Sequence, residues 1–192
     1  EAINMAFARI EQNMVVSSWT DSASSSLSRL EVNQYIEVPV NGCYKDRKWT
    51  EIDRDKIDEV ANRFFSIGGE HGWYYADSLW RLRGTLDKLL GGVGLSRGRR
   101  SKIDVEAGDT IDFWRVILAD RKNYRLLLFA EMKLPGEAWL EFAIVNNENR
   151  SILKQTATFR PKGIMGRNYW YAMLPFHFFI FRNMLKRIAG KT

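Results

Sequence analysis

The sequence contains little cysteine and little histidine, and this narrows the chemistry open to it. Cys43 is its single cysteine, and His71 and His177 are its two histidines. One cysteine cannot form an internal disulfide, which favours a reducing compartment, so we expect a cytoplasmic protein. These three residues do not have the spacing of a zinc site and do not suggest a nucleophilic triad. We therefore expect no bound metal.

Targeting and cofactor signals are also missing. No basic start followed by an apolar run marks a signal peptide. The apolar run 169–181 is shorter than the ~20 residues that cross a bilayer, so we expect no transmembrane segment. No glycine-rich dinucleotide fingerprint follows a predicted strand, and we expect no cofactor in this chain. The first residue is Glu1 rather than methionine, which suggests a piece of a longer precursor or a trimmed chain.

Apolar and aromatic side chains are abundant. Of the 192 residues, 45% are hydrophobic and 13% are aromatic, which is enough to bury one sizeable core. The net charge of +6 favours anionic partners. The aromatic residues, however, fall at positions that look buried rather than between the basic residues. We therefore expect no nucleic-acid binding.

The chain divides into an arm, residues 1–30, and a main domain, residues 31–192. The arm begins with a helical pattern that places Ile3, Phe7, Ile10 and Met14 on one face. A serine-rich linker, 17–28, follows it. An apolar helix face needs a partner, and the sequence leaves three open: the main domain, a second copy in a homo-oligomer, or an upstream domain.

The first part of the main domain mixes strands and helices. Alternation predicts a strand over 34–40, ended by the turn at Asn41-Gly42, and a short aromatic strand over 73–75. Asp53 and Asp77 are candidate N-caps of two helices. The first helix is predicted to bury Ile57, Val60, Ala61 and Phe64, and the second Leu79, Leu82, Leu86 and Leu89.

Four strand-like runs follow, over 110–119, 124–133, 137–145 and 151–160. Their connections are short, and short connections join antiparallel strands, so we expect an antiparallel meander. One side of this sheet is apolar by alternation. Glu131, Glu137 and Glu141 are predicted on its solvated exterior rather than as paired catalytic carboxylates.

The chain ends in a helical pattern over 166–189, which contains Pro175, a residue expected to bend it. Its broad apolar surface would be buried most economically against the concave side of the meander. Arg182, Lys186 and Arg187 follow the apolar run; they fit a membrane-surface role less well than a last helical turn whose cations suit the helix dipole. The order of elements predicts an α+β helix-grip fold, a curved antiparallel sheet wrapped around a long C-terminal helix.

Seven blocks of the sequence carry a resemblance: 72–73, 79–84, 91–94, 97–100, 112–116, 130–139 and 159–163. They resemble a bacterial family of unknown function in the helix-grip superfamily of START, polyketide-cyclase and birch-pollen-allergen proteins. This family commonly follows an NAD(P)-binding, short-chain-dehydrogenase-like domain, and residues 1–30 are similar to the end of such a domain. The resemblance implies a fold and a neighbour, with NAD(P) held upstream, but no catalytic residues.

A helix-grip domain often encloses a cavity, and polar side chains on its apolar walls would orient a ligand there. Gln155 is in phase with apolar neighbours on its strand, His177 interrupts the apolar helix, and Asp112 lies two residues from Trp114. A structural, hydrogen-bonded role for each competes with this hypothesis. The candidate ligand-binding residues are Asp112, Trp114, Phe142, Gln155, Trp170 and His177.

The glycine-rich basic stretch 91–102 is a candidate anion-binding loop. Glycines let backbone N–H groups approach an anion, and arginine binds phosphate or carboxylate with two hydrogen bonds. The stretch lacks the Gly-Lys-Ser/Thr ending of a P-loop. Arg97, Arg99 and Arg100 are the candidate ligands, against the alternative of a connection with solvated arginines.

These observations predict a domain that binds a small apolar or amphipathic molecule and presents it to an upstream redox domain. If the basic stretch 91–102 takes part, the molecule is anionic at one end. Two alternatives stay open. One is an enzyme of the cyclase, aromatase or hydratase type that uses a polar group in the cavity. The other is an oligomerisation or interaction module.

Overall fold

The computed structural model describes residues 37–89, 91–92, 104–146 and 150–191, without the side chains of Arg81 and Leu86. The arm 1–30, most of the predicted strand 34–40 and the arginines of the anion-binding hypothesis lie outside the described residues. Ten elements are present: β1 Tyr44–Ile52, η1 Arg54–Lys56, α3 Ile57–Phe65, α4 Asp77–Leu89, β2 Thr110–Ile111, β3 Trp114–Asp120, β4 Arg125–Ala130, β5 Gly136–Asn146, β6 Ser151–Pro161 and α5 Gly163–Ile188.

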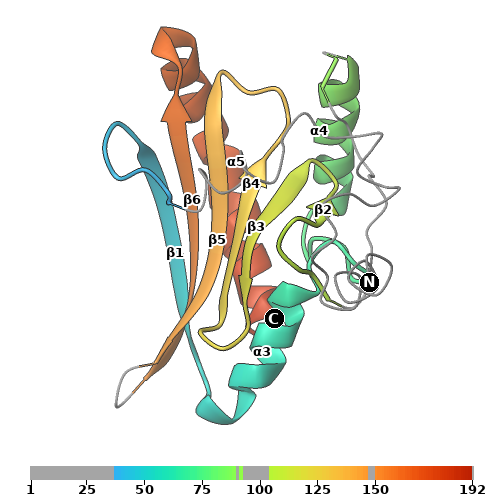
Figure 1. Ribbon diagram of the computed structural model, residues 1–192, viewed down its shortest axis with the longest axis vertical. Coiled ribbons are helices and arrows are strands. Elements are labelled where there is room, and N and C mark those ends of the chain that lie inside the picture. The colour runs from blue at the N-terminus through green and yellow to red at the C-terminus, as the bar shows by residue number, and fades with distance from the viewer. Residues whose placement is uncertain (1–36, 90, 93–103, 147–149, 192) are drawn as a thin grey trace, which may run out of the picture.

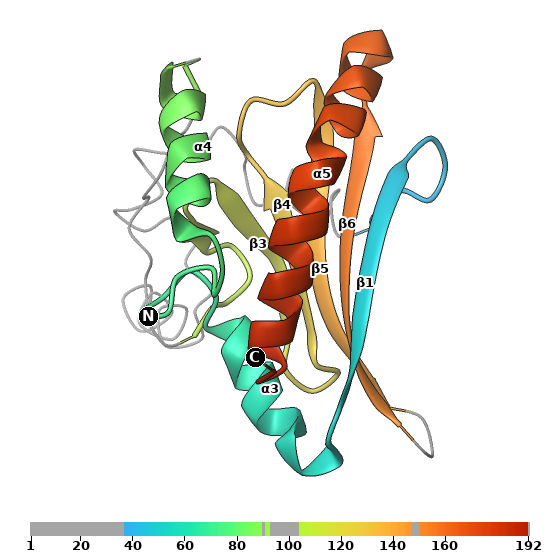
Figure 2. The same ribbon diagram turned by 180° about the vertical axis from the view of Figure 1, so that it is seen from behind.

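The strands form one antiparallel sheet in the order β1-β6-β5-β4-β3-β2, and β3 to β6 are the predicted meander. Long antiparallel strands β5 and β6 pair over their whole length, and β1 pairs with β6 at the edge. The register of β3 shifts between Val116 and Leu118, which marks a bulge. The sheet is curved, and α5 runs across its concave face (Figures 1 and 2). This is the predicted helix-grip fold.

The edge strand β1 corrects one prediction. The described part of the predicted strand, 37–40, is not in a strand, and the strand begins only after the turn at Asn41-Gly42, with Gly42 at φ +70°. Strand β1 is rich in charged side chains because it is an edge strand, where few positions are fully buried. Its polar sequence therefore hides the alternation.

The segment before α4 is not the predicted strand but a series of turns. Tyr74 and Ala76 adopt positive φ values of 63° and 58°, and the N–H of Trp73 donates to Oδ1 of Asp77 at 2.8 Å. Positive φ is incompatible with an extended strand. The turns place the Trp73 side chain in the core, where it is 2% exposed.

Helix α4 is present where predicted but presents another face to the core. Leu79, Leu82 and Leu89 are exposed, whereas Trp80 is buried and stacks on Trp73 with ring centroids 4.8 Å apart. One tryptophan buries more area than a leucine, and this contact sets the rotation of the helix. Asp87, fully buried, accepts the backbone N–H of Lys133 at 2.8 Å.

Helix α3 buries the predicted Val60, Ala61 and Phe64, whereas Ile57 is only partly buried. The predicted N-cap is wrong: Asp53 precedes the short helix η1, makes no capping hydrogen bond, and α3 begins only at Ile57. It lies at the C-terminal end of α5 (Figure 2), where Nη1 of Arg63 donates to the carbonyl oxygen of Ile188 at 3.2 Å. Phe64 stacks on Phe142 of the sheet with ring centroids 6.1 Å apart. Helices α3 and α5 therefore close the same end of the concave face.

Helix α5 buries only one of its faces. Its buried residues are Gly166, Trp170, Phe181, Met184, Leu185 and Ile188. The prediction that its whole apolar run packs on the sheet is wrong, because Phe176, Phe178 and Phe179 are 50–62% exposed. A helix can press only one side against a sheet, whatever the composition of the other. Among the described helices, none is long and apolar enough to cross a membrane.

The convex face of the sheet carries the three glutamates, each paired with an arginine. Glu141 accepts from Nε of Arg125 at 2.6 Å, and Glu137 pairs with Arg160. Glu131 is not solvated as predicted: it accepts from Nε of Arg115 at 2.7 Å, and both side chains are about 95% buried. Arg115 also donates to the Gly108 carbonyl at 2.9 Å, so the segment before β2 covers this pair.

Candidate functional site

The interior between the concave face and α5 contains a glutamine that the protein leaves unpaired. Gln155 lies on β6, opposite Phe142 of β5 and Lys48 of β1, and is 1% exposed. Neither its Oε1 nor its Nε2 has a hydrogen-bond partner. An unpaired buried polar atom costs about 1–3 kcal/mol, so the site has unused hydrogen-bonding capacity.

His177 projects from α5 into the same interior. Its ring lies 4.5 Å from the ring of Phe181 and 5.3 Å from that of Trp170, between centroids. Its buried Nδ1 has no hydrogen-bond partner. Burial lowers the pKa of His177 to about 4, although the carboxylate of Asp46 opposes the shift. The histidine is therefore neutral near pH 7 and able to donate or accept a hydrogen bond.

Strand β1 supplies charged groups to this interior. Alternation places Tyr44, Asp46 and Lys48 on the concave side, and Tyr44 confirms the direction because its ring stacks on Trp170 at 5.6 Å. Asp46 forms an ion pair with Lys48, and its Oδ2 lies 4.0 Å from Nδ1 of His177. Polar groups of β1, β6 and α5 therefore gather at one edge of the concave face.

A row of aromatic rings connects this edge with the opposite side of the interior. Between centroids, Phe181 of α5 lies 6.5 Å from Trp80 of α4, and Trp73 lies 6.2 Å from Trp114 of β3. The indole nitrogens of Trp80 and Trp114 are buried without a hydrogen-bond partner. The wall is thus apolar, with isolated donors set into it.

Asp112 sits at the far end of this row. It occupies the turn between β2 and β3 with φ +51°, and its Oδ2 accepts from Nε1 of Trp73 at 2.7 Å. The expectation that Asp112 and Trp114 share a face required a regular strand, and the turn breaks that strand. The carboxylate instead orients the Trp73 indole.

The structure places four of the predicted ligand-binding residues on the concave face and its covering helix as two adjacent pairs: Gln155 lies opposite Phe142, and His177 lies against Trp170. Trp114 is linked to them only through other rings, and Asp112 only through Trp73. Sequence reasoning missed Asp46, Phe181 and Trp80. The signal for Asp46 is its alternation with Tyr44 and Lys48. The sequence analysis does not use it, because it does not predict strand β1.

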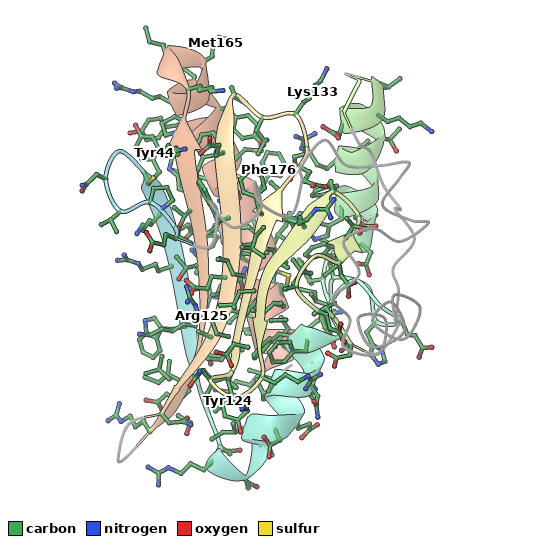
Figure 3. All side chains as sticks on the ribbon, viewed as in Figure 1. Tyr44, Tyr124, Arg125, Lys133, Met165 and Phe176 are labelled. Carbon is green, nitrogen blue, oxygen red and sulfur yellow. The ribbon has the colours of Figure 1, made fainter. Side chains whose placement is uncertain are left out.

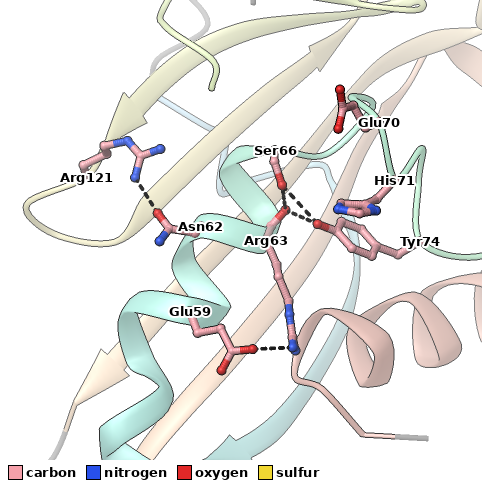
Figure 4. Close-up of a pocket in the computed structure, with 8 residues that line it drawn as sticks. All are labelled: Glu59, Asn62, Arg63, Ser66, Glu70, His71, Tyr74 and Arg121. Carbon is pink, nitrogen blue, oxygen red and sulfur yellow. Dashed lines mark hydrogen bonds and ion pairs between the residues drawn. The ribbon is translucent and has the colours of Figure 1, made fainter. Parts of the chain in front are cut away.

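A pocket with a volume of about 460 Å³ opens elsewhere, beside α3 (Figure 4). Its polar side chains bond to one another: the hydroxyls of Ser66 and Tyr74 are 3.0 Å apart, and Nη2 of Arg63 donates to Oε1 of Glu59 at 2.6 Å. These groups satisfy one another and leave less capacity for a ligand than Gln155 does. Within the described part of the chain, no three His, Cys, Asp or Glu side chains form a metal-binding group.

Comparison with solved structures finds similar but distant proteins. Norcoclaurine synthase from Thalictrum flavum, in complex with dopamine and hydroxybenzaldehyde, is 11% identical, with 77% of this chain and 87% of that chain covered and a TM-score of 0.47. Ara h 8.0201 is 10% identical, with 78% of this chain and 100% of that chain covered and a TM-score of 0.40. CalU16 from Micromonospora echinospora is 9% identical, with 77% of this chain and 81% of that chain covered and a TM-score of 0.35.

A search of curated proteins finds no match. A family model, described as "Protein of unknown function (DUF2867)", matches residues 41–184. This span includes every described strand of the sheet and most of α5. The chain therefore belongs to the DUF2867 family.

Proposed function

We propose that this domain binds a small apolar or amphipathic molecule between the concave face of its sheet and helices α4 and α5. The observation that carries the proposal is the Gln155 side chain, fully buried with both polar atoms unpaired. Proteins rarely retain such a group unless a partner completes it. A ligand with one hydrogen-bonding group would be that partner.

The surroundings of Gln155 favour a ligand that is otherwise apolar. Aromatic rings form the walls, and small side chains, Ala130, Ala138 and Ala157, occupy concave-face positions of the sheet. Binding sites for small molecules commonly combine apolar walls with a few polar groups that orient the ligand. Neutral His177 supplies a second polar contact beside Trp170. A carbonyl or hydroxyl group on an apolar body matches this arrangement.

A fluorescent fatty acid that brightens in apolar surroundings provides a direct test. We expect saturable binding to the wild-type domain and about tenfold weaker binding to Gln155→Leu, the loss expected for one hydrogen bond. Thr156→Val is the matched control, because Thr156 is the next residue on β6 and points to the other face. Equal affinity of all three proteins, or no binding to any, would remove the proposal.

An enzymatic function is the second candidate, and His177 is the observation that favours it. A histidine with a pKa of about 4 beside the Asp46 carboxylate, in an apolar interior, resembles the perturbed groups of active sites. Conversion of a bound molecule by the wild-type domain, lost in His177→Gln while binding persists, would establish this function. Unchanged conversion in the variant would exclude His177 as its acid or base.

We further propose that the domain works in the bacterial cytoplasm beside an NAD(P)-binding, short-chain-dehydrogenase-like domain. The support is the resemblance of residues 1–30 to the end of such a domain. The reading frame upstream of Glu1 tests this: a glycine-rich fingerprint between a strand and a helix supports the proposal. An upstream sequence without one would oppose it.

A further inference from the structure

The middle of α5 carries aromatic side chains on the surface. Phe178 and Phe179 are 50% and 62% exposed, with ring centroids 5.5 Å apart, and Tyr171 is 59% exposed. Large exposed apolar groups gathered in one region mark interaction sites. Figure 3 shows further side chains on this helix, among them Phe176 and, at its far end, Met165.

A groove of about 460 Å³ runs between β1 and α5 in this region. Apolar and basic side chains line it together: Lys48, Trp49, Thr50, Phe178, Arg182, Leu185 and Lys186. The guanidinium carbon of Arg182 lies 5.7 Å from the centre of the Phe178 ring, within cation–π range. The groove therefore offers aromatic and positive groups on one surface.

The positive charge of this surface is uncompensated. Helix α5 contains no acidic residue, and no acidic side chain of the described residues forms an ion pair with Arg182 or Lys186. The end of the helix dipole accounts for cations in the last turn, but Arg182 lies in the turn before it. An anionic partner would supply the missing counter-charge.

We propose that this surface, the aromatic–basic face formed by Tyr171, Phe178, Phe179, Arg182 and Lys186, docks the domain on anionic phospholipid. Tyrosine and phenylalanine insert at the boundary between headgroups and acyl chains. Lysine and arginine beside them contact anionic headgroups, each contributing to binding. A second copy of the chain fits less well, because a symmetric contact would bring the unpaired cations of both copies together.

Sedimentation with lipid vesicles tests the proposal. We expect the domain to bind vesicles of mixed phosphatidylcholine and phosphatidylglycerol, to bind phosphatidylcholine alone weakly, and to release as salt rises. Arg182→Gln with Lys186→Gln should weaken binding to the mixed vesicles about 30-fold, the effect of two surface cations. Phe178→Ser with Phe179→Ser should also weaken it, because exposed aromatic groups no longer insert.

Lys88→Gln with Lys122→Gln is the matched control, since it removes two exposed cations outside the face. We expect this variant to bind mixed vesicles like the wild type. Equal loss in both charge variants, or no binding to mixed vesicles, would overturn the proposal. So would a dimer that Phe179→Ser dissociates, because the face would then belong to self-association. Circular dichroism of each variant shows that a loss of binding is not a loss of fold.

Discussion

The two faces of the sheet differ in the pairing of their most deeply buried polar side chains. On the convex face, Glu131 and Glu141 accept hydrogen bonds from Arg115 and Arg125 at 2.7 and 2.6 Å. On the concave face, Gln155 is buried with no partner, and His177 of the covering helix keeps an unpaired Nδ1. A buried polar group with a hydrogen-bond partner is compatible with a stable fold. One without a partner costs free energy of folding until a ligand supplies the hydrogen bond. The unpaired atoms of the concave side are those that the proposed ligand would complete.

The buried Arg115–Glu131 pair provides the largest expected effect. Arg115→Met takes the buried guanidinium away from the Glu131 carboxylate, and we expect a loss of about 3–5 kcal/mol in the free energy of unfolding. The double variant Arg115→Met with Glu131→Met removes both charges and should lose much less. Urea denaturation measures both values. Equal losses in the single and double variants would show that side-chain packing, and not charge pairing, stabilises the convex face of the sheet.

His177 gives the next effect, through pH. Its pKa of about 4 in the folded domain lies below the 6.5 of an unfolded chain, so below pH 6.5 the unfolded state binds the extra proton. The free energy of unfolding should therefore fall between pH 6.5 and 4, by up to about 3 kcal/mol from this residue.

The variant His177→Gln should remove that part of the pH dependence. His71→Gln, at the other, exposed histidine, should keep it. Urea denaturation at pH 7 and pH 4.5 supplies the comparison, and carboxylate titration cancels between the variants. The same pH dependence in wild type and His177→Gln would mean that His177 is not desolvated in the folded domain.

Substitution of Gln155 on the concave face has the smallest expected effect on the free energy of unfolding. In the ligand-free domain, Gln155→Leu replaces two unpaired polar atoms by apolar ones, and we expect the free energy of unfolding to rise by about 1–2 kcal/mol. Thr156→Val on the opposite face should change it less. Thermal or urea denaturation of delipidated protein measures this. A clear loss of stability in Gln155→Leu would show that the glutamine has a structural partner.

The meander and the terminal helix could be predicted from sequence because their signals are local. The strands are apolar or alternating runs of residues, and each connection between them is a short turn. The strand β1 could not, because at the sheet edge its charged residues obscure the alternation. Which side of α4 and α5 meets the core is decided by tertiary contacts such as Trp73 on Trp80, so Leu82 and Phe179 were expected to be buried and are exposed.

Only part of the candidate site has a local signal in the sequence. Gln155 and His177 stand out because each interrupts an apolar pattern within its own element. Asp46 and Phe181 become part of the site only when β1 and α5 lie side by side. Asp112 was misplaced because a positive φ value at a non-glycine residue leaves no clear mark in the sequence.

Native mass spectrometry of the freshly purified chain tests the central claim most directly, because it reports whether the interior holds a guest. The account predicts a discrete added mass on the wild-type protein that collisional activation removes, present on Thr156→Val and much reduced on Gln155→Leu. A wild-type protein that carries no added mass and also binds no fatty acid would contradict it. So would an added mass that Gln155→Leu retains in full.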